Sequence, residues 1–396
     1  MKFFKRVKFD HLFFVFINLI FLLAVFYLYR KHLVGNDSTI SEWIINYQGG
    51  FTRRGLIGEV CFQLARIFDL ELRYMIFLLQ SILYFFFSVL LLIYIRNFKV
   101  NRLIIFALFS PLFLLYPIAE VEVLARKEIF LYIGFIIFLQ LSNVHYSKNS
   151  SLIYIFFVYP ILCLIWEPFI LFTFFSLFVI IINNKEDDLN KLFVKSLLSF
   201  STTIVVITII LFKKFNLTQH QQMAESLMLN FNEVCYMSCA LLAIKTTIYS
   251  QFQSVFTLLT FEVIFRYSLI LLIGFFPLAI LSFNSKIKKK VFFLPDNILI
   301  ILLILLSPSI ILFLSGTDWG RWVNMCYFFS ILTFVYLLKN NFIKLNKNIN
   351  FFENLYIKNK KKFIIFFIIF AFMWNPKTGM TGDVATNSLY KITYNK

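Results

Sequence analysis

Long apolar runs, separated by short polar segments, follow one another along nearly the whole chain. A run of about 20 apolar residues is long enough for an α-helix to cross the hydrocarbon core of a bilayer. The pattern therefore predicts about eleven membrane-spanning helices. Their expected ranges are 12–29, 75–95, 103–118, 129–141, 152–166, 169–182, 197–212, 267–283, 298–315, 322–338 and 363–374.

Several of the predicted spans are short for this task. Runs of fewer than about 18 residues either extend into their flanking segments or form a re-entrant pair. The two runs around Trp166, Glu167 and Pro168 need a tight turn between them. If these two runs instead form one broken helix, every later loop changes side of the membrane.

The distribution of basic residues predicts the orientation of the chain. Lysines gather at the N-terminus, residues 1–11, and in loops on the same side of the membrane, most densely in 339–362. Because cytoplasmic loops carry an excess of basic residues, we expect a cytoplasmic N-terminus. The segments 31–74, 213–256 and 375–396 then lie on the outer side.

The composition supports one class of protein. Of the 396 residues, 60% are hydrophobic and 55 are Phe, which is outside the range of a soluble domain. We expect an all-α polytopic integral membrane protein, with a single transmembrane domain over residues 1–396. The net charge of +18 is spread between apolar runs, so it indicates contact with anionic membrane lipids and not with nucleic acid.

The polar segment NYQGGFTRRGLIGE, residues 46–59, is the most distinctive part of the first outer loop. Gly49 and Gly50 allow a tight turn whose N–H groups can face an anion. Arg53 and Arg54 follow, and the planar arginine side chain is the preferred partner of phosphate oxygens. The alternative is that both arginines only extend toward lipid headgroups.

An amphipathic helix is expected from Arg54 onward. The apolar residues that recur at helical spacing are Leu56, Val60, Leu64, Ile67 and Phe68. They predict a helix lying along the membrane interface. A glycine turn and an arginine pair at the N-terminus of such a helix form a suitable site for a lipid-linked phosphate.

Further charged pairs lie in the other outer segments. Glu122 and Arg126 are four residues apart, as are Glu262 and Arg266, and this spacing pairs charges on one helix. Such pairs are often only structural. Charges at membrane depth are nevertheless costly unless they are paired or functional, so the functional alternative stays open.

The sequence DWGRW places Asp318 and Arg321 beside Trp319 and Trp322. Tryptophans in such a position form an interfacial belt or stack on sugar rings. Belt formation alone does not explain an aspartate beside an arginine.

The five cysteines do not form a metal-binding pattern, and the sequence contains no histidine cluster or nucleotide-binding loop. No metal or other cofactor is expected. Cys235 and Cys239 form a disulfide if the outer compartment is oxidising, although a helical four-residue spacing is poor disulfide geometry. The alternative is two buried thiols.

A resemblance to known membrane enzymes follows from these features. An N-terminal span, a polar outer loop with acids and arginines, an interfacial helix and many further spans resemble the lipid-dependent membrane glycosyltransferases of the GT-C type. The chain as a whole is similar to the O-antigen polymerase family, and GGFTRRGLIGE and DWGRW resemble stretches in membrane proteins of surface-polysaccharide clusters. The chain differs from the common polymerase pattern in having one long outer loop, 213–256, where two are often found.

The resemblance implies a multi-pass enzyme of lipopolysaccharide biosynthesis in the bacterial inner membrane. It would transfer an undecaprenyl-diphosphate-linked oligosaccharide onto another lipid-linked unit at the periplasmic face, with a flippase and a chain-length regulator as partners. Arginines would bind the diphosphate and offset the charge on the leaving group, and a carboxylate would deprotonate the acceptor hydroxyl.

Specific residues are expected in these roles. The diphosphate ligands would be Arg53, Arg54, Arg126 and Arg321. The base would be Glu59 or Asp318, and after them Glu122 or Glu42. The rings of Trp319 and Trp322 would stack on sugars.

Other functions stay open. A flippase of lipid-linked sugars needs polar residues at the bilayer midplane and often contains an internal repeat, and the sequence shows neither. A membrane acyltransferase needs a reactive histidine, and His11, His32, His145 and His220 lie in no such motif. Another GT-C-type glycosyltransferase and a scaffold without chemistry are the remaining alternatives.

Overall fold

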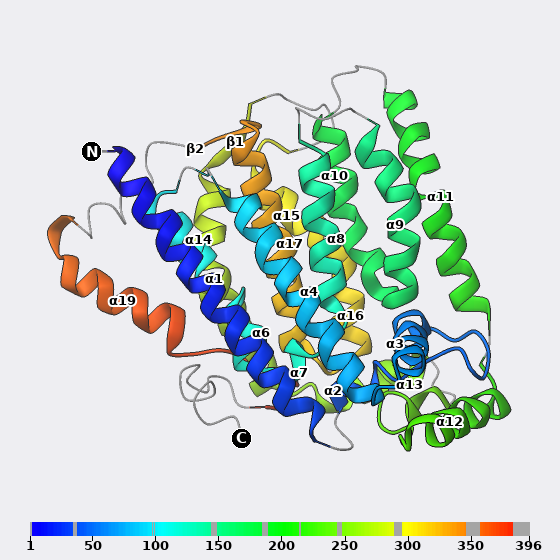
Figure 1. Cartoon of the computed structure of the whole chain (residues 1–396). Helices are drawn as coiled ribbons and strands as arrows, with labels where there is room; N and C mark the ends of the chain where they lie inside the picture. Colours follow the sequence, from blue (N-terminus) through cyan, green and yellow to red (C-terminus); the bar gives the residue numbers. More distant parts are fainter. Residues whose placement is uncertain are drawn as a thin grey trace. The chain divides into compact units, whose positions relative to one another are not determined.

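The computed structural model describes residues 2–34, 38–96, 98, 100–143, 149–183, 189–213, 215–243, 248–288, 295–345 and 357–382. Parts of the predicted segments 213–256, 339–362 and 375–396 lie outside these ranges. Within the described ranges the chain is almost entirely helical, and one antiparallel pair of three-residue strands forms the sheet structure (Figure 1).

The helices and strands follow one another in this order: α1 (Lys2–His32), α2 (Ser38–Ser41), α3 (Gly55–Phe68), α4 (Leu72–Ile95), α5 (Arg102–Leu108), α6 (Leu115–Ala119), α7 (Val121–Leu124), α8 (Glu128–Leu141), α9 (Ser150–Ile165), the 3-10 helix η1 (Glu167–Phe172), α10 (Thr173–Asn183), α11 (Leu189–Phe212), α12 (Leu217–Phe231), η2 (Ala240–Ala243), α13 (Ile248–Leu258), α14 (Phe261–Phe283), β1 (Ser285–Ile287), α15 (Ile298–Leu306), η3 (Ser307–Ser309), α16 (Ile310–Ser315), α17 (Trp319–Lys339), β2 (Ile343–Leu345) and α19 (Lys360–Phe372).

The prediction of a helical membrane protein is confirmed. Among the described residues, six helices are long and apolar enough to cross a bilayer. They cover Phe9–His32, Leu72–Ile95, Phe193–Phe212, Phe261–Phe283, Ile298–Ser315 and Trp319–Lys339. Shorter apolar helices lie at Glu128–Leu141, Ser150–Ile165 and Glu167–Asn183, where further spans were expected. The count of about eleven stays a prediction.

The expected continuous span 103–118 is wrong. The chain leaves α5 at Leu108 and enters α6 only at Leu115, because Pro111 has no N–H to continue a helix. Backbone carbonyls that this break leaves without a helical donor are bonded by α17. The amide of Asn324 donates to the carbonyls of Leu112 (2.7 Å) and Phe113 (3.1 Å). A polar side chain in an apolar helix thus satisfies an irregular backbone, as a low-dielectric surrounding requires.

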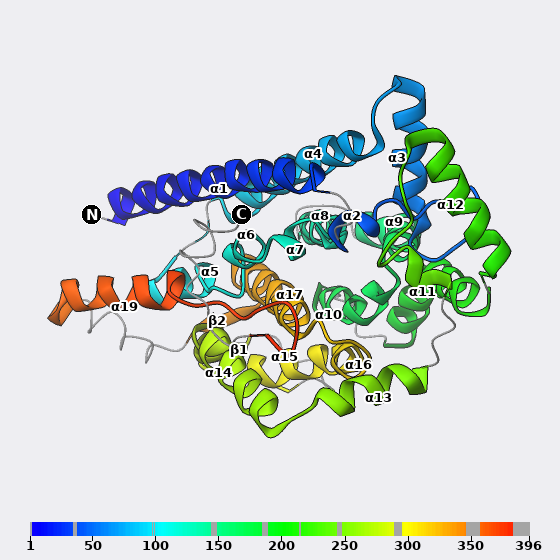
Figure 2. The same ribbon diagram turned by 90° about the horizontal axis from the view of Figure 1, so that it is seen from below.

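The contacts divide the chain into two compact units, each described here by itself. The first unit comprises Met1–Ile20, Ile95–Val123 and Thr247–Lys396. Its central element is α17, whose residues are buried from Gly320 to Leu337. Figure 2 shows α14, α15 and α16 along one side of α17. Such burial explains why most residues of α17 are apolar on every side of the helix, with Asn324 among the few polar exceptions.

The second unit comprises Phe21–Tyr94 and Leu124–Thr246. In it α9 packs against both α8 and α11, and α10 contacts the same two helices (Figure 1). Aromatic side chains fill this bundle, with Tyr159 in edge-to-face contact with Phe169 and its hydroxyl bonded to Ser176. The turn expected at Trp166 is present: α9 ends at Ile165, Trp166 is extended, and η1 begins at Glu167.

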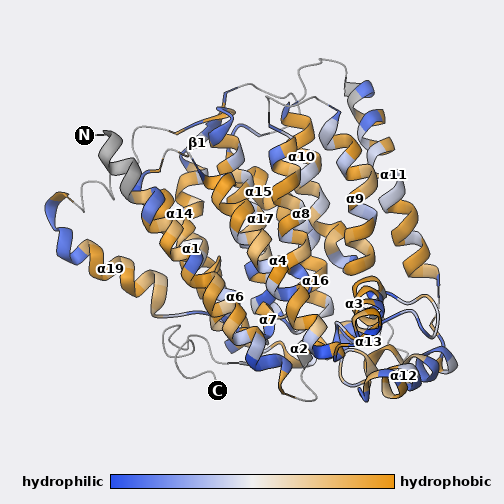
Figure 3. Ribbon diagram, in the orientation of Figure 1, coloured by the Kyte–Doolittle hydropathy of each residue, from blue (hydrophilic) through white to orange (hydrophobic). Residues whose placement is uncertain are grey.

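Polar structure in the second unit gathers at one end of this bundle. In Figure 1 the turn from α9 to α10, helix α3 and helix α12 lie together at the lower end of the unit. Figure 3 shows hydrophilic colour along α12 and hydrophobic colour along α10. Contacts confirm the grouping, because α3 packs on α9 and the ring of Phe62 in α3 meets Phe231 of α12 edge to face at 5.1 Å.

The helix predicted from Arg54 onward is present as α3. Its buried residues are not the predicted apolar stripe, however. Ile57, Cys61 and Phe62 face the protein, while Ile67 and Phe68 are 72% and 62% exposed. The helix is therefore apolar on two sides. One side packs against the protein, and the other is an exposed apolar surface that suits contact with lipid.

Two glycines allow α3 and α12 to lie close to residues 45–49 of the first outer loop. A Cβ on Gly58 would lie 1.7 Å from the carbonyl oxygen of Ile45, and one on Gly49 would lie 1.9 Å from that of Gln219. These contacts hold the first outer loop against two helices. Glycine at both positions is required by space.

We expect Gly58→Ala to destabilise the folded protein by about 1–3 kcal/mol, because the added methyl group overlaps backbone that cannot move freely. Helix propensity alone would give the opposite sign, a gain of roughly 1 kcal/mol. Thermal unfolding in detergent measures the difference. Gly379→Ala is the control, since no atom lies within 4 Å of its Cβ position. A Gly58→Ala protein as stable as the wild type would contradict the packing described.

Candidate functional site

Six charged side chains meet at the polar end of the second unit. We call them the cation cluster: Glu42, Arg53, Arg54, Arg126, Lys127 and Glu167. They come from four parts of the chain that are far apart in sequence.

Local structure explains why these parts present their charges together. Glu42 directly follows α2, and the neighbouring Trp43 is completely buried and donates its indole N–H to the carbonyl of Ala125 at 2.6 Å. The amide of Gln80 in α4 donates to the same carbonyl at 3.0 Å. These two bonds place Arg126 and Lys127, the next residues, beside the loop that carries Glu42.

Arg54 is the residue before α3, and it forms the strongest pair of the cluster. Its backbone is left-handed (φ 62°), and no side chain caps the helix there. Its Nε and Nη2 donate to the two carboxylate oxygens of Glu167 at 2.8 and 2.9 Å. Such a two-bonded pair is both strong and directional. Arg53 adds a longer contact to Glu167 at 3.8 Å.

A second carboxylate, Glu42, is 2% exposed and serves two arginines. Its Oε1 lies 2.8 Å from Nη1 of Arg126 and 3.6 Å from Nη1 of Arg54. The guanidinium groups around Glu167 outweigh the effect of burial, which opposes ionisation, and hold the pKa of that carboxyl below its usual value. Both acids therefore act as internal counter-ions.

Lys127 is completely buried, and its Nζ donates to the backbone carbonyl of Arg54 at 2.6 Å. This bond fixes the left-handed backbone of Arg54, the residue directly before α3. Burial lowers the pKa of Lys127 to about 8, with Glu42 opposing the shift and Arg54 adding to it. At neutral pH the side chain is charged.

The charges of the cluster do not balance. Among these six residues four side chains are positive and two are carboxylates, an excess of two positive charges that does not count the buried carboxylate of Glu128, the residue after Lys127. Helices α3 and α8 both begin here, and the positive ends of their dipoles add to the excess. An anion is the ligand that such an arrangement favours.

Three buried donors at this end of the unit have no hydrogen-bond partner among the described residues. They are Nε of Arg126 and the hydroxyls of Tyr47 and Thr52. Burial and Glu59 raise the pKa of Tyr47 to about 12, so its hydroxyl keeps its proton at neutral pH. Buried donors without partners are rare, and an oxygen-rich ligand would satisfy them.

Glu59, expected as a base, lies beside the cluster in a different role. Its two oxygens accept from the backbone N–H of Tyr47 at 2.8 Å and from the amides of Gln48 and Gln63, each at 2.7 Å. The carboxylate thus closes the glycine turn onto α3. Its catalytic role stays a prediction.

The remaining predicted residues belong to the first unit. Arg321 is nearly buried, contacts Asp318 at 3.1 Å and lies over the ring of Trp322 at 4.9 Å. Trp319 donates its indole N–H to the carbonyl of Phe313 and contacts Tyr267 edge to face. This arrangement makes Trp319 and Trp322 parts of a packed corner at the start of α17, and their stacking on sugars stays a prediction.

The two predicted helical charge pairs have different outcomes. Glu262 and Arg266 are together on α14, at 3.9 Å, although Arg266 makes a shorter bond to the carbonyl of Gly382 at 2.7 Å. The prediction that Glu122 and Arg126 share one helix is wrong, because α7 ends at Leu124. Glu122 is exposed, and the buried Arg126 pairs with Glu42.

Sequence reasoning placed Arg53, Arg54, Arg126 and Glu42 in the site but missed Lys127 and Glu167. Glu167 had a signal, since an acid between two apolar runs is costly without a partner. The only signal for Lys127 in the sequence was its position next to Arg126. A pairing of charges from distant loops is not visible in a single sequence.

Comparisons of the chain with protein-family models, with curated proteins and with solved structures find no match. The functional conclusions therefore depend on the fold and on the cation cluster.

The buried Lys127 predicts a pH dependence of stability. Its pKa is about 8 in the folded protein and 10.5 for an ordinary lysine. Between these values the unfolded chain binds a proton that the folded protein has released, so the free energy of unfolding rises with pH through this window. Lys127→Met removes this contribution.

Chemical unfolding of the wild type and of Lys127→Met at pH 8 and pH 10 measures the effect. We expect the wild type to gain stability relative to the variant as the pH rises. A difference between the two proteins that is constant across this range would contradict the assignment.

Proposed function

We propose that the cation cluster binds the diphosphate of a lipid-linked oligosaccharide, and that the protein is a membrane glycosyltransferase that polymerises such units. The observation that carries this proposal is the gathering of three arginines and the buried Lys127 around two carboxylates, Glu42 and Glu167, at one end of an apolar helix bundle. A diphosphate that joins a lipid to a sugar is a dianion of matching charge.

The chemistry of the side chains supports a phosphate ligand over a carboxylate. Arginine presents parallel N–H groups that fit the oxygens of phosphate, and three arginines are available within one cluster. The buried donors of Arg126, Tyr47 and Thr52 supply further hydrogen bonds. Exposed apolar residues of α3 give the lipid chain a surface beside the charged site.

In the proposed reaction the polyprenyl diphosphate is the leaving group. Arg53, Arg54 and Arg126, with Lys127, offset the charge that develops on it as the glycosidic bond to the acceptor forms. Glu42 and Glu167 hold the guanidinium groups in place before the substrate arrives. Phosphate oxygens then share Arg54 with Glu167.

A base must take the proton of the acceptor hydroxyl. Glu42 lies within the cluster, and Glu59, Glu122 and Asp318 remain the other candidates. Arg321, which pairs with Asp318 in the first unit, remains a candidate diphosphate ligand.

The proposal includes a place in the cell. We propose about eleven spans in a GT-C-like arrangement, in a bacterial inner membrane, with a cytoplasmic N-terminus. The cluster then faces the periplasm, where an undecaprenyl-diphosphate-linked O-antigen unit would be joined to the next.

We expect Arg54→Ala to abolish long-chain polysaccharide while single-repeat glycolipid is still made. Arg54→Lys keeps the charge but cannot make the two-bonded contact, so it should also shorten the chains. Surface glycolipid resolved by gel electrophoresis measures the result, and the membrane level of each variant is checked in parallel.

Arg66→Ala is the matched control, because Arg66 lies in the last turn of α3, the helix that Arg54 precedes, and is exposed. Normal chain length in Arg54→Ala would contradict the site. Loss of all surface glycolipid, including the single repeat, would indicate a flippase instead.

A further inference from the structure

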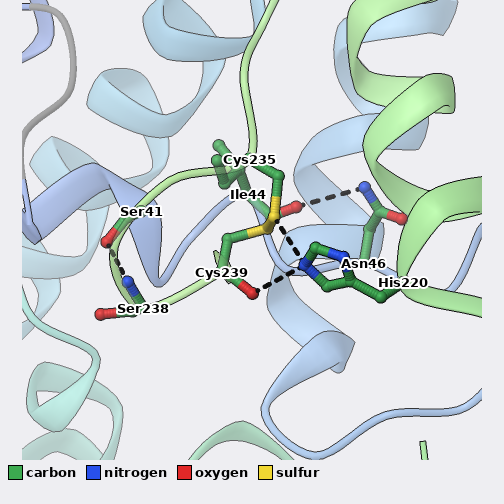
Figure 4. The surroundings of a disulfide bond; sticks show 7 residues. All are labelled: Ser41, Ile44, Asn46, His220, Cys235, Ser238 and Cys239. Carbon is green, nitrogen blue, oxygen red and sulfur yellow. Dashed lines mark hydrogen bonds between the residues drawn. A yellow bond between two sulfur atoms is a disulfide. The ribbon is translucent and has the colours of Figure 1, made fainter. Parts of the chain in front are cut away.

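A second cluster of reactive side chains lies at the polar end of the second unit, outside the cation cluster. Cys235 and Cys239 form a disulfide, and His220 of α12 lies beside it (Figure 4). The bridge is possible despite the four-residue spacing because the segment between Asn232 and Cys239 is not helical. The imidazole Nε2 lies 3.2 Å from Sγ of Cys235 and 3.2 Å from the carbonyl oxygen of Cys239.

Two thiolates and one imidazole are the ligand types that zinc prefers. One ligand atom from each of Cys235, Cys239 and His220 lies within 4.8 Å of the other two. Around a tetrahedral zinc ion, sulfur ligands are separated by roughly 3.8 Å and sulfur and nitrogen by roughly 3.6 Å. Opening the disulfide therefore requires only a small separation of the two sulfurs.

The loop that carries the cysteines is held independently of the disulfide. Before it, Glu233 pairs with both ends of the Arg73 guanidinium, with one contact at 2.9 Å. Within it, the backbone N–H of Ser238 donates to the hydroxyl of Ser41 at 3.2 Å. These anchors keep the three ligand groups together when the bridge is broken.

Access is unequal for the two sulfurs. Cys235 is half-buried and Cys239 is completely buried, so a reductant reaches Cys235 first.

We propose that His220, Cys235 and Cys239 form a redox-controlled metal site, which is closed as a disulfide and, once reduced, binds a thiophilic divalent cation such as Zn²⁺. A dithiol reductant opens the site: its two thiols are oxidised to a disulfide, and Cys235 and Cys239 each gain a hydrogen. Zn²⁺ then displaces the two thiol protons, and the neutral imidazole of His220 binds through the lone pair of Nε2, with its proton on Nδ1 and the contact of Nε2 to the carbonyl of Cys239 given up. Water completes the tetrahedral geometry.

Zinc binding to the full-length protein in detergent tests this site. The protein is first reduced with a phosphine in metal-free buffer. Reduction of the disulfide converts the phosphine to its oxide, with the oxygen taken from water, and ZnCl₂ is then added. Gel filtration followed by elemental analysis gives the zinc retained per chain. Cobalt substitution gives a second readout, since thiolate ligands produce a charge-transfer absorption band.

The reduced wild type should retain one zinc per chain and the oxidised protein none. His220→Ala keeps both cysteines and should bind zinc at least about 10-fold more weakly, because even outer-shell partners of a metal contribute that much. Cys163→Ala is the matched control, since this buried cysteine lies on α9 away from the site.

Three results would overturn the proposal. One is a reduced protein that has gained two free thiols but retains no zinc. Another is His220→Ala binding zinc as tightly as the wild type. Unfolding on reduction, detected by gel filtration, would also count against it, because the anchors of Glu233 and Ser238 would then be insufficient.

Discussion

Buried charge at the end of an apolar helix bundle is the constraint on which the second unit depends. Taking an ion out of water costs several kcal/mol even after the surroundings relax, so each such group needs a partner. Glu42 pairs with Arg126, and Arg54 pairs with Glu167 and lies 3.6 Å from Glu42. These residues come from the end of α2, the start of α3, the segment before α8 and the start of η1. Their pairing therefore fixes four distant parts of the chain in one arrangement, and Lys127 adds a further tie through the carbonyl of Arg54.

The same pairing leaves positive charge in excess, and this connects structure to function. Four basic groups lie together with two carboxylates, and helices α3 and α8 both begin beside them. The proposed diphosphate, a dianion, would pair with the excess positive charge of these six residues. The glycine turn closed by Glu59 and the loop anchored by Glu233 position the surrounding backbone without adding to this excess.

The sequence predicted a helical membrane protein and named four of the six residues that the structure brings together in the cation cluster, and physical reasons explain what it missed. Long apolar runs indicate spans directly, and arginines after a glycine turn indicate an anion site. Pro111 was visible as a helix breaker, but its compensation by Asn324 of α17 depends on a contact between residues far apart in sequence. The partner of Arg126 was assigned to Glu122, four residues before it, whereas tertiary packing brings Glu42 to it. Local spacing predicts pairs on one helix and cannot predict pairs between loops.

Equilibrium binding of a polyprenyl diphosphate to the purified protein in nanodiscs tests the central claim most directly, with the corresponding polyprenyl alcohol as the uncharged ligand. Arg53→Gln is the informative variant, because Arg53 is the most exposed arginine of the cluster and makes only a long contact, so its loss disturbs the fold least. A lost charge-assisted contact of about 1.5–3 kcal/mol should weaken diphosphate binding by roughly 10- to 100-fold, while alcohol binding and an Arg66→Gln control stay unchanged. Equal affinity of the wild type for the diphosphate and the alcohol, or equal diphosphate binding by the wild type and Arg53→Gln, would contradict a diphosphate site in the cation cluster.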